Sequence, residues 1–239
     1  PNCDHQALTV ALIRGAFEYQ GQKCSAASRA YIPESVWNSI KENYIGEVAK
    51  ISVGDPKDFS NFMSAVIDKK SFDNIAGYID RAKKDSGCEI VTGGTYDDAI
   101  GYFIQPTTII CSDPKYESMA EEIFGPVLSI HVYPDHDFEK ILTICDSTSE
   151  YALTGSIFAR NRQDVLTAMD ALRYSSGNFY INDKPTGAVV GQQPFGGARG
   201  SGTNDKAGSP LNLLRWVSPR SIKETFAPPH DWTYGFLNE

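Results

Sequence analysis

The chain has 239 residues, of which 41% are hydrophobic and 22% are charged, and its formal net charge is −8. This length can bury a substantial core without disulfides, and the composition is that of an ordinary globular protein. The negative charge argues against non-specific nucleic-acid binding as the main activity, and no apolar run in the sequence reaches the length of a membrane span.

Helices and strands are expected to alternate along the chain. Periodic apolar residues predict a first helix over residues 5–20, which Gly21 would end. Further helices are expected at 34–45, 71–84 (with Ser71 as the cap), 138–146 and 162–174. Strands are expected at 29–33, 89–92, 102–111, 126–133, 154–159 and 178–182. This alternation is typical of an α/β fold, a layered domain with a largely parallel sheet flanked by helices.

Cys24 follows the first predicted helix in the run Gly21-Gln22-Lys23-Cys24-Ser25. A thiolate is the nucleophile in cysteine chemistry, and a cation such as that of Lys23 favours the thiolate. The local run alone leaves open that Cys24 is a small buried hydrophobic residue, as most cysteines are. The remaining cysteines are interpreted as structural: Cys3, Cys88, Cys111 and Cys145.

The spacing of cysteines and histidines argues against two further kinds of site. The five cysteines form no C-x-x-C pair, which together with their odd number favours a reducing compartment over a disulfide framework. The four histidines are scattered, so no metal site is expected.

Two later motifs give the cysteine run a context. Glu121-Glu122-Ile123-Phe124-Gly125-Pro126-Val127 lies about a hundred residues after Cys24, and Pro194-Phe195-Gly196-Gly197 with Ser201-Gly202 lies further on. In this order the three motifs resemble the nucleophile segment, the cofactor-contact motif and the substrate-side loop of the aldehyde dehydrogenase family. The resemblance implies that residues 1–239 form the family's catalytic, thiol-bearing domain.

The resemblance also implies roles for single residues. Cys24 would be the catalytic nucleophile, and its own backbone N–H would help to form the oxyanion hole. Glu122 would accept hydrogen bonds from the nicotinamide-side ribose hydroxyls of NAD, and Phe124 would pack near the nicotinamide ring. The structural alternatives are a solvated carboxylate for Glu122 and a core ring for Phe124.

Residues 65–68, 178–184 and 190–199 carry a closer likeness to one branch of the family. That branch oxidises L-glutamate γ-semialdehyde, which forms from Δ1-pyrroline-5-carboxylate, to L-glutamate in proline catabolism. By this resemblance, backbone N–H groups of Gly187 and Ala188 anchor the α-carboxylate of the substrate. Family members often carry serine at the position of Ala188, so that hydroxyl is missing and substrate affinity could fall.

Three further residues are candidates for substrate binding. Lys23 and Ser25, which flank the nucleophile, would help to bind the charged substrate or tune Cys24. Phe195 would pack against the methylene chain of the substrate. The alternatives are an exposed lysine, a helix-capping serine and ordinary core packing of the phenylalanine.

The resemblance implies an incomplete set of catalytic parts. The family's general-base glutamate and oxyanion-hole asparagine lie upstream, with the NAD-binding domain, so these parts are expected to be absent and the chain alone is expected to be inactive. A substrate-anchor loop is expected at about 184–210, and an aromatic tail at about 224–239 would dock on another subunit or on its own domain. The family further implies a homo-oligomer, in the mitochondrial matrix if the source is eukaryotic and otherwise in the cytoplasm.

Other classes of function remain open at this point. One is a broad-specificity or different semialdehyde dehydrogenase. Another is an NAD-independent cysteine acyltransferase or hydrolase, which would turn over thioesters or esters. A third is a non-catalytic binding or scaffolding protein on a retained enzyme fold, whose role would survive Cys24→Ala.

Overall fold

The structure, a computed structural model, describes residues 2–237, so Pro1 and the last two residues of the predicted tail, 238–239, lie outside the described residues. Its α-helices are α1 His5–Phe17, α2 Glu34–Val48, α3 Lys69–Lys84, α4 Glu117–Ala120, α5 Phe138–Ser147 and α6 Arg162–Ala171. Its 3-10 helices are η1 Glu18–Gly21, η2 Asp135–Asp137, η3 Pro210–Trp216 and η4 Gly235–Leu237. Its strands are β1 Arg29–Pro33, β2 Cys88–Thr92, β3 Tyr96–Asp97, β4 Phe103–Ile104, β5 Thr107–Cys111, β6 Val127–Tyr133, β7 Tyr151–Ala152, β8 Thr154–Ile157, β9 Asn178–Ile181 and β10 Ala198–Arg199.

The main sheet has four strands in the order β1-β6-β5-β2. Strand β6 pairs in parallel with both β1 and β5, and β2 at the edge pairs antiparallel with β5. A second, two-stranded sheet is formed by the parallel strands β8 and β9. The predicted α/β class with a largely parallel sheet is therefore confirmed.

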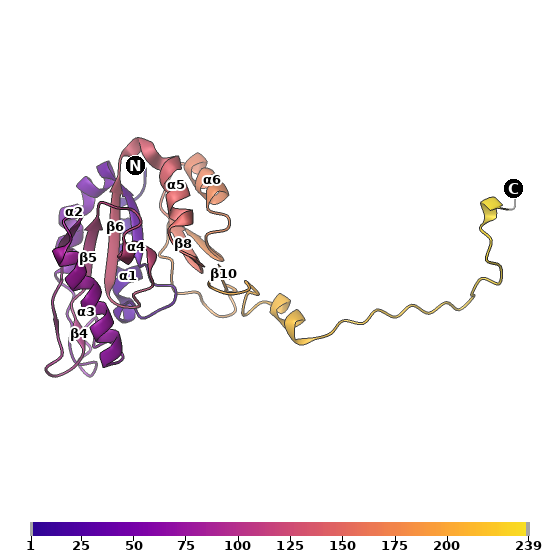
Figure 1. Cartoon of the computed structure of the whole chain (residues 1–239), viewed down its shortest axis with the longest axis horizontal. Helices are drawn as coiled ribbons and strands as arrows, with labels where there is room; N and C mark the ends of the chain where they lie inside the picture. Colours follow the sequence, from indigo (N-terminus) through magenta and orange to yellow (C-terminus); the bar gives the residue numbers. More distant parts are fainter. Residues whose placement is uncertain (1, 238–239) are drawn as a thin grey trace.

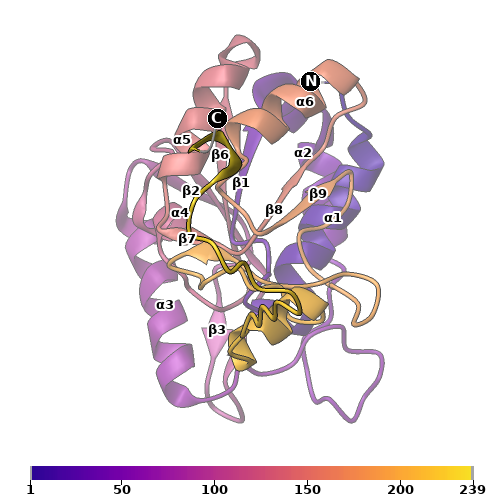
Figure 2. The same cartoon turned by 90° about the vertical axis from the view of Figure 1, so that its right-hand side faces the viewer.

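Helices cover both faces of the main sheet, and the alternation of side chains along β6 separates two cores. Leu128 and Ile130 pack with α1 and α2 in one core, whereas Val127 packs with α3 in the other. Figure 2 shows α3 on one side of the sheet and α1 with α2 on the other. Helices α5 and α6 pack together with residues of β8 and β9 in a third, smaller cluster.

The first helix ends earlier than the sequence predicts. Helix α1 stops at Phe17, and a 3-10 turn follows in which Tyr19 and Gln20 have φ values of 55° and 58°. Residues other than glycine rarely adopt this left-handed conformation, so periodicity alone could not place the end. The periodic apolar residues that predicted this helix include Leu8, Leu12 and Ala16, and all three are buried.

Two further boundaries differ for local reasons. Ser71 is not the cap of α3, because the Asp68 side chain accepts a hydrogen bond from the Ser71 backbone N–H and the helix begins at Lys69. The single strand expected at 102–111 is divided into β4 and β5 around Pro106, which has no N–H to donate to a ladder.

The C-terminal segment leaves the folded body. Residues 217–234 run outward as an extended segment that leads to η4 (Figure 1). Phe226 and Trp232 in this segment are 90% and 85% exposed. The predicted alternative in which the tail docks on its own domain is therefore not what the structure shows, and docking on another subunit stays a prediction.

Candidate active site

Cys24 lies at the tip of a tight turn that follows η1. The backbone N–H of Ala26 donates to the carbonyl of Lys23 at 3.0 Å and closes the turn, and the N–H of Ala27 donates to the carbonyl of Gly15 in α1 at 2.9 Å. The two central residues of the turn differ in exposure, because Cys24 is exposed and Ser25 is buried. The helix α1 thus holds a turn that presents the thiol outward.

Gly21 places this turn directly against the segment that contains Glu122 and Phe124. Gly21 has a φ of +64°, and a Cβ atom at this position would lie 2.3 Å from the carbonyl oxygen of Gly125. Only glycine fits both conditions, since other residues have a Cβ and rarely adopt positive φ. The first two sequence motifs therefore meet in space by backbone contact.

The segment of the second motif exposes its functional candidates. Phe124 has a φ of 58° and is 44% exposed, so it is not the core ring of the structural alternative. Glu122 is exposed as well. Its neighbour Glu121 instead accepts a short hydrogen bond from Tyr78, and burial together with this bond raises the pKa of Tyr78 to about 12. Glu121 therefore has a structural partner, and Glu122 is the carboxylate left for a ligand.

One cavity of about 560 Å³ is lined by Cys24, Glu122 and Phe124 together with Lys23. It continues between β1 and β8, whose residues line it along their whole length. An exposed carboxylate can accept from two vicinal hydroxyls, and an aromatic ring can pack on a planar ring, so Glu122 and Phe124 fit the nicotinamide end of NAD. Among the described residues, the lining of this cavity does not include Ser25, Gly187, Ala188 or Phe195.

The buried hydroxyl of Ser25 faces the predicted substrate-anchor loop. Its Oγ atom lies 2.8 Å from Oγ1 of Thr186, which is also buried. The alternative of a helix-capping serine is wrong, because this bond joins residues 161 positions apart in the sequence. The contact brings the predicted anchor residues Gly187, which is exposed, and Ala188, which is half-buried, close to the cysteine turn.

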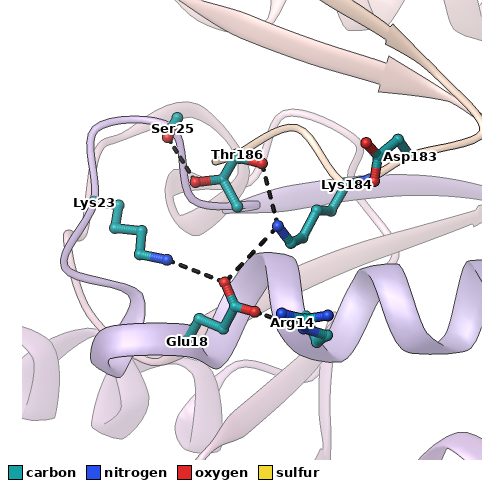
Figure 3. Close-up of polar contacts among 7 residues, drawn as sticks. All are labelled: Arg14, Glu18, Lys23, Ser25, Asp183, Lys184 and Thr186. Carbon is teal, nitrogen blue, oxygen red and sulfur yellow. Dashed lines mark hydrogen bonds and ion pairs between the residues drawn. The ribbon is translucent and has the colours of Figure 1, made fainter. Parts of the chain in front are cut away.

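Lys23 is held by an ion pair. Its Nζ lies 3.1 Å from Oε2 of Glu18, and its side chain is 32% exposed, so it is not the freely solvated lysine of the alternative interpretation. The same carboxylate accepts from Arg14 at 2.6 Å and lies 4.0 Å from Nζ of Lys184 (Figure 3). Burial tends to raise the pKa of Glu18, but the hydrogen bonds from Lys23 and Arg14 outweigh it and hold this pKa below its usual value.

Phe195 belongs to a loop fixed by backbone contacts. Its N–H and carbonyl pair with those of Ala207 at 2.9 and 2.8 Å. The side-chain amide of Asn178 donates to the carbonyl of Pro194 at 2.9 Å, and Nζ of Lys206 donates to the carbonyl of Gly196, also at 2.9 Å. Phe195 itself is half-buried, so its ring is positioned by a built loop at the end of β9.

The sequence reasoning did not single out Glu18, Lys184 or Thr186 for the site. Arg14 and Glu18 lie four residues apart, the spacing of an ion pair on one helix face, and the structure contains this pair. No local signal connects Glu18 with Lys184, because the two meet only in the folded chain.

The remaining cysteines occupy structural positions. Cys111 is buried, and burial raises its pKa to about 12. Burial also raises the pKa values of Cys3, Cys88 and Cys145 above the usual range. A raised pKa disfavours the reactive thiolate, in keeping with the structural interpretation.

Residues 2–237 lack two further kinds of feature. They contain no group of three or more histidine, cysteine, aspartate or glutamate side chains placed to hold a metal ion. No helix among the described residues is both long and apolar enough to cross a membrane.

Residues 1–222 match the model of the aldehyde dehydrogenase family, and the chain belongs to this family. It is 60% identical over 225 residues to the mitochondrial Delta-1-pyrroline-5-carboxylate dehydrogenase of Dictyostelium discoideum, covering 94% of this chain and 40% of that protein. It is 50% identical over 237 residues to the Homo sapiens protein of the same name, covering 99% of this chain and 42% of that protein.

The fold is similar to that of a solved structure of the same family. The Delta-pyrroline-5-carboxylate dehydrogenase of Mycobacterium tuberculosis bound with NAD superposes with a TM-score of 0.86 at 54% identity, covering 99% of this chain and 43% of that chain. The chain thus spans about two fifths of the length of the curated relatives it matches.

Proposed function

We propose that the chain is the thiol-bearing catalytic part of an NAD-dependent dehydrogenase that oxidises L-glutamate γ-semialdehyde to L-glutamate in proline catabolism. The observation that carries the proposal is the exposed Cys24 thiol in one cavity with Glu122 and Phe124. The relatives named for Δ1-pyrroline-5-carboxylate oxidation support the substrate.

The chemistry starts at the thiol of Cys24. Its thiolate adds to the aldehyde carbon and gives a thiohemiacetal, whose oxyanion is stabilised by the backbone N–H of Cys24. When bound, NAD supplies the acceptor for the hydride of this thiohemiacetal, and a thioester on Cys24 remains for water to hydrolyse. Glu122 and Phe124 hold and orient the nicotinamide end beside the thiol.

The far end of the substrate lies on the loop at Gly187 and Ala188. Backbone N–H groups of these residues bind the α-carboxylate. Lys23 and Ser25 help to bind the charged substrate, and Phe195 packs on its methylene chain. Ala188 supplies no hydroxyl, and the hydroxyl of Ser25 is already engaged with Thr186. A missing hydrogen bond to a charged group costs about 1.5–3 kcal/mol, so this site relies more on its backbone donors.

The NAD-binding domain, with the general base and the oxyanion-hole asparagine, lies outside this chain in our proposal, and the chain alone is inactive. The relatives' greater length supports this. The cavity supports this absence as well. It runs along β1 and β8, and each of these strands has one edge that pairs with no other strand within residues 2–237. A further part of the protein would cover these edges.

The compartment is proposed from the relatives, and the assembly from the exposed side chains of the tail. The Dictyostelium discoideum and Homo sapiens relatives carry the word mitochondrial in their names, which supports a mitochondrial matrix location if the source is eukaryotic. For any other source the proposed location is the cytoplasm. A homo-oligomer is supported by the exposed apolar side chains of the tail.

The test is NADH formation by the full-length protein that carries this chain. Glutamate semialdehyde, succinate semialdehyde and propanal are compared, with Cys24→Ala as the matched variant. We expect a strong preference for glutamate semialdehyde that the variant loses. Equal rates on all three aldehydes would reduce the proposal to a broad-specificity aldehyde dehydrogenase. Ester turnover with no NADH from any aldehyde would instead support a cysteine acyltransferase or hydrolase.

A further inference from the structure

We propose that Glu18 is a positioning residue that fixes the spacing between the Cys24 thiol and the substrate-anchor loop, and that it thereby selects aldehydes by their length. The inference rests on the function proposed above, because it names what sets the length specificity of that same site.

Two segments far apart in the sequence form the two ends of the site. One is the cysteine turn, residues 23–26, and the other is the first part of the substrate-anchor loop, residues 184–188. A substrate that bears an aldehyde at one end and a carboxylate at the other must reach both at once. The spacing between these segments therefore determines which chain length fits, and whatever fixes that spacing contributes to specificity.

The carboxylate of Glu18 connects the two segments. Its Oε2 atom lies 3.1 Å from Nζ of Lys23 and 4.0 Å from Nζ of Lys184. Figure 3 shows both lysines pointing to this oxygen from opposite sides, one from the cysteine turn and one from the anchor loop. Without the carboxylate between them, the two ammonium groups would repel each other.

Lys184 also contacts the backbone of the anchor loop, so its ion pair with Glu18 restrains that loop. Its Nζ donates to the carbonyl of Thr186 at 3.4 Å. A Cβ atom built on Gly187 would lie 3.0 Å from the same Nζ, so the ammonium group is packed against the backbone at Gly187. The Ser25–Thr186 hydrogen bond is a second tie between the two segments, and together the ties restrain both position and orientation.

Glu18 is itself held in place by helix α1. Its other oxygen, Oε1, accepts from Nε of Arg14 at 2.6 Å, which ties the carboxylate back to α1. Helix α1 is anchored in the core through Leu12 and Phe17, which are 6% and 0% exposed. The side chains of Glu18 and Lys184 are only 18% and 20% exposed, so solvent screens this pair less than an ordinary surface pair.

The test uses Glu18→Gln in the full-length protein, which keeps the shape and removes the charge. kcat and KM are measured for glutamate semialdehyde, for its homologues one methylene shorter and one longer, and for propanal. We expect kcat/KM for glutamate semialdehyde to fall about tenfold, mainly through KM, as loss of a partly buried charged contact predicts. The preference over both homologues should fall about as much, while propanal oxidation changes about twofold at most.

The matched control is Glu47→Gln, which removes a carboxylate at the end of α2 whose exposed ion pair with Lys50 spans 2.6 Å. It should leave the length preference unchanged. An unchanged preference in Glu18→Gln would overturn the inference. An equal loss on propanal and on glutamate semialdehyde would also overturn it, because it would indicate a general structural defect.

Hydrogen exchange separates a failure of this inference from a failure of the proposed function. In Glu18→Gln, the backbone amides of Ala26, which donates to the carbonyl of Lys23, and of Gln192, which donates to the carbonyl of Val189 in the anchor loop, should both exchange about tenfold faster than in the unchanged protein. If the unchanged protein does not oxidise glutamate semialdehyde, the proposed function fails, and exchange still decides whether Glu18 couples the two segments. Unchanged exchange in either segment would refute the coupling.

Discussion

Replacing Gly21 by alanine tests the contact that joins the cysteine turn to the segment containing Glu122 and Phe124. At a φ of +64°, an L-residue with a Cβ costs about 1–2 kcal/mol relative to glycine. The new Cβ would lie 2.3 Å from the carbonyl oxygen of Gly125 and 2.8 Å from that of Ala16. Both neighbours are backbone, so relief requires a backbone shift of the kind that costs about 1–3 kcal/mol.

The two costs together predict that Gly21→Ala lowers the free energy of unfolding by about 2–5 kcal/mol. The assay is urea unfolding of the chain, followed by the fluorescence of Trp37, which is 5% exposed in the core. The other tryptophans, Trp216 and Trp232, are 80% and 85% exposed and should change little on unfolding.

Gly46→Ala is the matched control. Gly46 lies inside α2, and a Cβ there would meet nothing within 4 Å. Alanine in a helix interior should therefore raise the free energy of unfolding by about 0.5–1 kcal/mol. A Gly21→Ala protein within about 0.5 kcal/mol of the unchanged chain would refute the steric reasoning. If Gly46→Ala destabilised the protein as much as Gly21→Ala, the loss could not be attributed to the contact of Gly21 with the backbone of Gly125.

Three more outcomes are expected. Tyr44→Phe removes a buried hydroxyl that lies 2.7 Å from Oγ1 of Thr108, so urea unfolding should show a loss of about 1–3 kcal/mol. The control is Tyr174→Phe, whose ring is 72% exposed, and it should change the free energy of unfolding by less than about 0.5 kcal/mol. Equal losses in the two variants would contradict a stabilising role of the Tyr44–Thr108 hydrogen bond. Lys206→Met removes the donor to the carbonyl of Gly196 and should accelerate trypsin cleavage after Arg199, whereas an unchanged cleavage rate would show that Lys206 does not hold the loop. The lowered pKa of Glu18 means that its pairs with Arg14, Lys23 and Lys184 stabilise the fold above the ordinary carboxyl pKa and lose this effect as the pH falls through the folded value. The difference in unfolding free energy between the unchanged chain and Glu18→Gln should therefore shrink below about pH 4, and a difference that grows in acid would reverse the assigned sign.

Local sequence signals were sufficient for much of the fold. The apolar run at 126–133 predicted β6 to within one residue, and 29–33 predicted β1 at its observed bounds. Such elements depend on the period and type of neighbouring residues, which the sequence contains in full. The three motifs were equally local, and they sufficed to identify the family that the comparisons show.

Tertiary structure decided how these motifs meet. Helix α1 ends at Phe17 because the following backbone turns left-handed to bring Gly21 against Gly125, a contact between residues about a hundred positions apart. The distant partners of Ser25 and Glu18 became visible only in the fold, since Thr186 and Lys184 approach them from the segment that follows β9. The sequence by itself thus determined which residues are the candidates for the chemistry. Their spacing depends on packing between distant segments, which no local period or motif encodes.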